Sequence, residues 1–287
     1  MIKFLLHPAA YMLLLVSCFC MAEDENWRNR PSSNIEFTEE DIAAEISFGR
    51  EIAARIFGKH PAYDNPELTR YVTLVGNSLA LGANRPELEF YFSILDTDEL
   101  NSYAAPGGYV FISKGSLKMM RDESELAGVL AYQIAHIVDK HIVRQLNLKG
   151  SGIPPSLALL IGGTSTALRA ALQATTPVPS IRHSDFTINS GLELIYSNTY
   201  KTEDKIQSAN TALTLSAMSG YDPKGHVRYL ERIKQSISSA PDRSANLPIE
   251  LHSQIDQLQR SFTEEGFGNI NFVKDAIRFT ETMKSLK

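Results

Sequence analysis

The chain has 287 residues, of which 43% are hydrophobic and 21% charged, and it carries a formal net charge of −5. These proportions are ordinary for a folded domain and exclude collagen-like, coiled-coil and disordered classes. The small acidic excess and the lack of a basic block argue against a nucleic-acid-binding protein held by phosphate contacts.

Residues 1–22 have the pattern of a bacterial export signal. Lys3 precedes a short apolar run that ends at Ala22, and acidic sequence follows at once. This run is too short for the roughly 20 residues of a membrane-spanning helix. Cleavage after Ala22 is one interpretation, and the other is a lipoprotein signal that ends before Cys18 and leaves Cys18 as a lipid anchor. Both predict a bacterial envelope protein, periplasmic or associated with the outer membrane.

A predicted tether, residues 23–36, leads into one predicted domain, residues 37–287. The first helix of this domain begins at a capping-box pattern, Thr38-Glu39-Glu40-Asp41. A second helix begins at Asn65-Pro66, with proline at the first helical position. Apolar residues recur at helical spacing after both starts, which predicts that each helix buries one face.

Two strands are predicted after these helices. Residues 89–95 and Tyr109–Ser113 are aromatic and β-branched, as strands commonly are. Pro106-Gly107-Gly108 forms a turn between them. Because the connection is short, we expect the two strands to pair antiparallel.

The rest of the chain is predicted to be helical. Glu123 to Leu148 has the pattern of one long helix, and Phe186 to Met218 has that of another, which stops before Gly220. Residues 157–174 predict a surface or flap helix. Shorter helices are expected at 223–237, 249–264 and 271–285. The sequence thus predicts a predominantly helical α+β domain with a small antiparallel sheet.

The first long helix contains Tyr132-Gln133-Ile134-Ala135-His136, which has the frame of the zincin motif H-E-x-x-H. In that motif two histidines on one helix face bind zinc, and the glutamate activates water. Only His136 remains of the three functional residues, and a lone histidine among apolar neighbours is usually structural. Four further histidines lack ligand spacing, and we expect them to be surface or capping residues: His60, His183, His226 and His252.

The segments around this motif resemble, in order, peptidase family M-48, a family of zinc metallopeptidases that includes the HtpX and BepA types. Asn101 to Gly115 resembles its edge-strand block, and Glu123 to Ala131 resembles the approach to its zinc motif. His141 fits a further histidine of the family. Ser219 to Pro223 resembles the segment after its second zinc helix. The resemblance covers about residues 40–235 and implies a zincin-like fold with an edge sheet beside the active-site helix.

The resemblance also implies where the site lies. Tyr132 takes the place of the first zinc-binding histidine, and Gln133 takes that of the general base. Counting back from Gly220 puts the third ligand, a glutamate in the family, on Gln207. The edge-strand block is implied to line the substrate cleft through Asn101, Ala104, Pro106, Gly107 and Gly108.

These substitutions change the chemistry of the implied site. A catalytic zinc needs three protein ligands and an open water position. Tyr132 ligates only as a phenolate, from a pKa near 10, and the neutral carbonyl of Gln207 suits zinc poorly. Gln133 cannot take a proton from water, and losing a general base removes about 10²–10⁴ in rate. We therefore expect absent or weakly bound zinc and a pseudopeptidase.

Two functional interpretations remain. An inactive domain retains a peptide-binding or chaperone-like role, because its edge strand accepts unfolded or extended polypeptides by β-addition. Alternatively, the chain is an active zinc metalloendopeptidase with an atypical site, in which Glu203, one turn before Gln207, supplies a carboxylate. The zinc content of the purified mature protein distinguishes the two.

Overall fold

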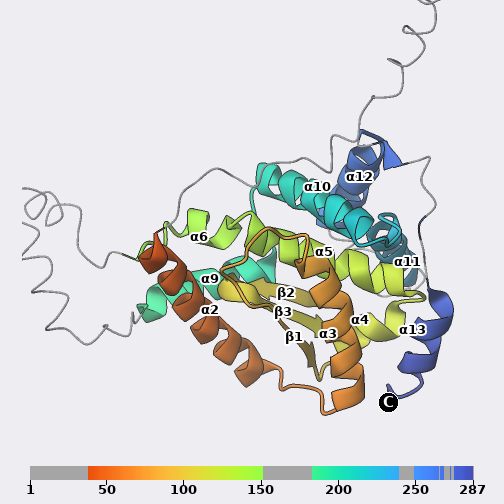
Figure 1. Cartoon of the computed structure of the whole chain (residues 1–287), viewed down its shortest axis with the longest axis horizontal. Helices are drawn as coiled ribbons and strands as arrows, with labels where there is room; N and C mark the ends of the chain where they lie inside the picture. Colours follow the sequence, from red (N-terminus) through yellow and green to blue (C-terminus); the bar gives the residue numbers. More distant parts are fainter. Residues whose placement is uncertain are drawn as a thin grey trace, which may run out of the picture. The chain divides into compact units, whose positions relative to one another are not determined.

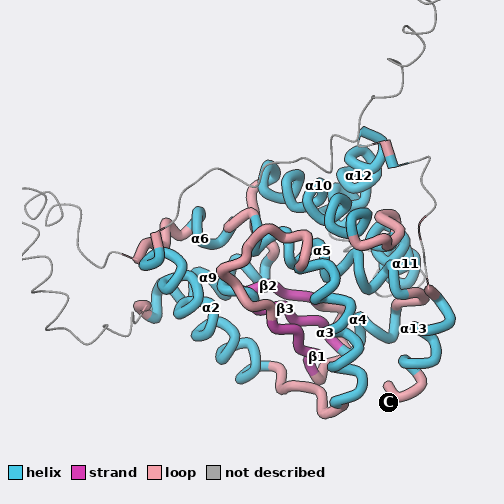
Figure 2. Tube along the Cα trace, in the orientation of Figure 1, coloured by secondary structure: helices cyan, strands magenta, loops and turns pink. Residues whose placement is uncertain are grey.

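A small sheet surrounded by helices makes up the part of the chain that the structure describes (Figures 1 and 2). The computed structural model describes residues 38–150, 183–238, 249–264, 266–267, 272 and 275–286. The described elements belong to one compact unit. The predicted export signal and tether and the predicted helix at 157–174 lie outside the described residues.

The first two helices begin where the sequence predicts. Helix α2, Glu39–Lys59, starts with a full capping box, in which the Thr38 hydroxyl accepts from the Asp41 amide at 3.1 Å. Helix α3, Pro66–Ala80, starts with the Asn65 side chain accepting from the Leu68 amide at 3.0 Å. Such caps satisfy amides that the helix leaves without partners, and each is worth about 0.5–2 kcal/mol.

The sheet has three strands in the order β1-β3-β2: β1 is Tyr91–Leu95, β2 is Ser102–Ala105 and β3 is Tyr109–Ser113. β1 and β3 run parallel, so the predicted antiparallel pairing of these two segments is wrong. The connection between them contains β2, which itself pairs antiparallel with β3. This strand is short and rich in alanine, and therefore gives no strand signal in the sequence.

The turn between β2 and β3 is the short 3₁₀ helix η2, Pro106–Gly108. Gly107 and Gly108 have positive φ values of 76° and 98°, which favour glycine. A Cβ atom on Gly108 would lie 2.0 Å from the Glu89 carbonyl oxygen, and one on Gly107 would lie 2.8 Å from the Ile46 Cα. The two glycines therefore allow the turn to pack directly against neighbouring backbone.

Each predicted long helix is two helices in the structure. Helix α5, Glu123–Val138, is separated from α6, His141–Gln145, by Lys140 with φ at 54°. Helix α9, Asp185–Ser197, is separated from α10, Thr202–Met218, by Asn198 with φ at 50°. One left-handed residue ends a helix without changing the apolar spacing, so periodicity does not reveal the break.

Three later helices lie close to their predicted positions: α11, Gly225–Ser238; α12, Ile249–Glu264; and α13, Ala276–Met283. The short helix α4, Lys114–Met119, was not predicted. Among the described residues, no helix is both long and apolar enough to cross a membrane.

Helix α5 forms the centre of the unit. It contacts α3, α10, α11 and the sheet, and nearly all its residues are buried. Figure 1 shows α10 and α12 on one side of α5 and the sheet on the other. A helix that is apolar on every side belongs in a core. The motif residues on α5 are thus placed between the sheet and the later helices.

Candidate active site

Helix α5 is held at its N-terminal end by charged groups. The Asp122 side chain caps it by accepting from the Glu125 amide at 2.9 Å. The buried Glu125 carboxylate accepts two hydrogen bonds from Arg232 on α11, at 2.5 and 2.7 Å. This paired geometry orients α5 against α11.

Gln133 lies on the side of α5 that faces the edge strand β2. Its Nε2 donates to the Ser102 hydroxyl at 2.9 Å. The residue at the implied general-base position therefore joins α5 to the edge strand. A neutral amide donates and accepts hydrogen bonds but does not take up a proton at neutral pH.

His136 is buried, with 4% of its surface exposed, and its Nδ1 has two polar neighbours. It lies 2.9 Å from the Nδ1 of His141, and the Ser208 hydroxyl lies 3.2 Å from both. Two imidazole nitrogens at this distance share one proton. Burial lowers the pKa of His136 well below its usual value and that of His141 to about 4, so both rings are neutral at pH 7.

Aromatic rings enclose His136. Tyr200 stacks on it with ring centres 4.2 Å apart, and Tyr132 meets it edge-on at 4.9 Å. His226 packs against Tyr132 at 5.0 Å. The ring cluster covers most of the His136 side chain, which keeps only 4% of its surface.

The prediction that His226 is a surface or capping residue is wrong, because its side chain is 4% exposed and lies within α11. A Cβ atom on Gly128 would lie 2.5 Å from the His226 amide nitrogen, so α5 and α11 touch at this glycine. Within the described part of the chain, the buried Nδ1 of His226 has no hydrogen-bond partner. Burial lowers the pKa of His226 to about 3, which keeps the ring neutral.

Gln207 lies on α10 but bonds elsewhere. Its Nε2 donates to the Asp139 carboxylate at 3.0 Å, and its Oε1 accepts from Arg144 at 3.4 Å. The residue of α10 that bonds His136 is the fully buried Ser208. The structure thus brings Tyr132, Gln133 and His136 together and directs Gln207 to the end of α5. The assignment of Gln207 to a ligand position stays a prediction.

Glu203, the alternative carboxylate, is exposed on α10. Its neighbour Asp204 lies nearer the site, with a carboxylate oxygen 3.6 Å from the Nε2 of His141. The sequence did not indicate Asp204, Ser208 or Tyr200. These residues come from the second half of the chain, and no motif spacing connects them with His136.

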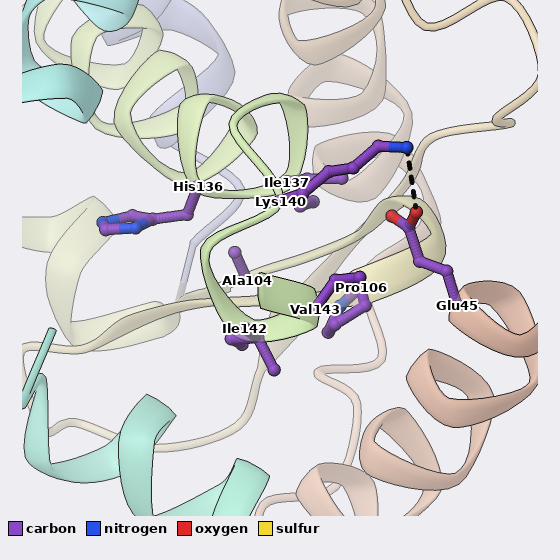
Figure 3. A pocket seen from close by; sticks show the side chains of 8 residues that line it. All are labelled: Glu45, Ala104, Pro106, His136, Ile137, Lys140, Ile142 and Val143. Atoms are coloured by element: carbon purple, nitrogen blue, oxygen red, sulfur yellow. Dashed lines mark ion pairs between the residues drawn. The ribbon is translucent and has the colours of Figure 1, made fainter. Parts of the chain in front are cut away.

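The glycines of the edge-strand block pack inward. The Gly107 amide donates to the buried Glu45 at 3.3 Å, and Glu45 forms an ion pair with Arg85 at 2.8 Å. Lys140 lies 3.9 Å from the same carboxylate (Figure 3). Pro106, Gly107 and Gly108 are all buried and hold the edge block against α2.

Ala104 borders the small cavity of Figure 3, which has room for about one water molecule. The His136 ring points away from Lys140 in this view. Asn101 lies at the start of the block, and its amide donates to the Ser113 hydroxyl at 3.1 Å. Ala104 and Pro106 thus line the same small cavity as His136, and the substrate-binding role of the edge-strand block stays a prediction.

The outer edge of β2 keeps free backbone groups. The Ser113 amide donates to the Asn101 carbonyl at 2.9 Å, so Asn101, Tyr103 and Ala105 direct their backbone groups toward β3. Ser102 and Ala104 then direct theirs away from the sheet. No described backbone group bonds to them there.

The donors around His136 do not fit a catalytic zinc. His136 directs Nδ1 at another histidine, Tyr200 covers its ring, and Gln207 is bonded to Asp139. Across the described ranges, no three His, Cys, Asp or Glu side chains are grouped so as to hold a metal ion.

The comparisons with known proteins agree with this architecture. The family model "Peptidase family M48" matches residues 66–257. The beta-barrel assembly-enhancing protease of Yersinia pestis is 24% identical over 211 residues, which are 72% of this chain and 42% of that protein. The putative beta-barrel assembly-enhancing protease of Vibrio cholerae is 30% identical over 129 residues, 45% of this chain and 27% of that protein.

A eukaryotic relative is also similar. The mitochondrial metalloendopeptidase OMA1 of Schizosaccharomyces pombe is 26% identical over 165 residues, 58% of this chain and 44% of that protein. The chain thus spans less than half the length of these curated relatives.

Proposed function

Because the chain belongs to peptidase family M48, we propose that it is a polypeptide-binding module of the cell envelope that has lost zinc-dependent hydrolysis. Its partners are unfolded or extended polypeptide segments. They bind along the outer edge of β2, where the backbone groups of Ser102 and Ala104 accept an additional strand.

The observation that carries the proposal is the hydrogen bond between Gln133 and Ser102, at 2.9 Å. It places a neutral amide where a peptidase of this frame needs a base. It also ties the active-site helix to the edge strand that would hold the substrate. In this proposal Gln133 makes a structural contact at the position where an active peptidase has its proton-transferring glutamate.

The envelope location and the kind of client rest on two supports. The first is the predicted export signal over residues 1–22, which in one of its two interpretations leaves Cys18 as a lipid anchor. The second is the similarity to proteins named for β-barrel assembly. We therefore propose unfolded envelope proteins as the clients.

Zinc content and cleavage test the loss of hydrolysis. The mature protein, purified from zinc-supplemented cells, is expected to hold far less than one zinc per chain and to leave casein intact with or without a chelator. The matched control is His136→Ala, which should change neither result. One zinc per chain that is lost in His136→Ala, together with chelator-sensitive cleavage, would establish the alternative of an active peptidase.

A binding measurement tests the retained role. Fluorescein-labelled casein serves as an unfolded probe, and its anisotropy is followed as the protein is titrated in. Saturable binding supports the proposal. Binding only to a folded control protein would contradict it.

A further inference from the structure

The connection between α9 and α10, residues Asn198–Lys201, covers the site. Thr199 and Lys201 are exposed, whereas Tyr200 turns inward and keeps only 8% of its surface. Its ring stacks on His136 at an angle of 25° and lies 6.2 Å from the ring of His141. One side chain of an otherwise exposed connection therefore closes the site.

The end of α9 continues this cover over the edge strand. Tyr196 meets Tyr103 of β2 edge-on, with ring centres 5.1 Å apart. The ammonium group of Lys59 lies 4.2 Å above the Tyr196 ring. A continuous stretch, Tyr196 to Tyr200, thus lies against both the edge strand and His136.

Few directed bonds hold this connection in place. Asn198 ends α9 with a left-handed backbone, and Lys201 begins α10 without a side-chain cap. Among the described residues, the Tyr200 side chain makes ring contacts and no hydrogen bond. Ring packing can be broken and remade without leaving a buried polar group unsatisfied.

We propose that Asn198–Lys201 is a latch, and that an extended polypeptide enters the cleft only when Tyr200 withdraws from His136. This inference rests on the proposed function, since it describes how access to the same edge strand is controlled. In the closed state the Tyr200 ring covers one face of His136. The measured affinity for polypeptide is then the intrinsic affinity reduced by the fraction of molecules that are open.

Three variants of the full mature chain test the latch. Tyr200→Ala removes the ring and should tighten casein binding roughly tenfold, because the open fraction rises. Tyr200→Phe keeps the ring and should bind like the natural protein. Phe279→Ala truncates a buried aromatic of α13, far along the chain from the cleft, and controls for general loosening. It should also bind like the natural protein.

A second readout does not depend on binding. Modification of His136 by diethyl pyrocarbonate, followed by mass spectrometry, should be slow in the natural protein and in Tyr200→Phe and faster in Tyr200→Ala. If His136 stays unreactive in Tyr200→Ala, the latch is overturned. Should Tyr200→Ala fail to fold, Tyr200→Leu keeps apolar volume without a stacking ring and is measured in the same two ways.

The two readouts separate the proposals. Equal casein affinity in all variants, with His136 exposed in Tyr200→Ala, overturns the latch and leaves the proposed function in place. No casein binding by any variant, despite an exposed His136, overturns the proposed function and the latch with it.

Discussion

His136, His141 and His226 are each buried at the candidate site, and burial keeps their rings neutral. In the unfolded chain all three take up protons below a pKa of 6.5. Because their pKa values are lower in the folded state, the full stability of the folded state is present above pH 6.5. It is lost as the pH falls from 6.5 toward the pKa values of the folded state. Asp139 acts in the opposite direction, since burial raises its pKa to about 6.

The first prediction is therefore a loss of stability in mild acid. The three histidines destabilise the folded state as the pH falls, and Asp139 offsets part of this effect. Near pH 5 the free energy of unfolding should therefore fall by about 2–3 kcal/mol for each unit that the pH is lowered. Urea unfolding at pH 7, 6 and 5 measures this slope. In His226→Leu the slope should become shallower by about 1.4 kcal/mol per pH unit. A slope that His226→Leu leaves unchanged would contradict the buried, neutral state of this ring.

At the scale of elements, two glycines in helices should respond to alanine in opposite ways. Gly128→Ala places a Cβ atom 2.5 Å from the backbone of α11, so α5 and α11 must separate. We expect this overpacking to lower the free energy of unfolding by about 1–3 kcal/mol. Gly58 of α2 has nothing within 4 Å of its added Cβ, and Gly58→Ala should stabilise by about 0.4–1 kcal/mol. Thermal unfolding of both variants is the measurement.

The Glu45 carboxylate links α2, the η2 turn and the end of α5. Glu45→Ala removes the buried partner of Arg85 and leaves it only the more exposed Glu87 as an ion-pair partner. The free energy of unfolding should fall by up to about 3–5 kcal/mol. The matched control is Arg55→Ala, which breaks an ion pair with Asp185 whose side chains are 54% and 84% exposed. Arg55→Ala should change the free energy of unfolding by no more than about 1 kcal/mol. Similar losses in the two variants would show that Glu45 does not organise these elements.

At the scale of the whole molecule, the buried Glu123 fastens the C-terminal helix. Its carboxylate accepts from Tyr221 at 3.0 Å and from the Nε of Arg278 on α13 at 2.7 Å. Arg278→Ala should therefore free α13 and speed amide hydrogen exchange over Ala276–Met283 by about tenfold or more, while α12 keeps its protection. Lys284→Ala removes only an exposed pair on α13 and serves as the control.

The sequence predicted the fold wherever local chemistry decides the structure. The caps at Thr38 and Asn65 start their helices as expected. The breaks at Lys140 and Asn198 were missed, because one left-handed residue leaves helical spacing intact. The parallel pairing of β1 with β3 was missed because it depends on β2, whose residues carry little strand signal.

The candidate site was predictable on one helix only. Residues spaced by four on α5 share a face, so Tyr132 and His136 were placed together correctly. The facing residues come from α10 and its preceding connection. The rotation of these elements depends on packing between helices, so the contacts of Ser208 and Tyr200 with His136 could not be read from the sequence.

The strand order also bears on how the chain folds. β2 and β3 are joined by three residues, whereas the parallel pair must close a loop that contains the whole of β2. Short loops close with less entropy loss and local contacts form early. We expect the β2–β3 hairpin to nucleate the sheet and β1 to join last, so that the edge strand that we propose to bind polypeptides is among the first parts of the sheet to form.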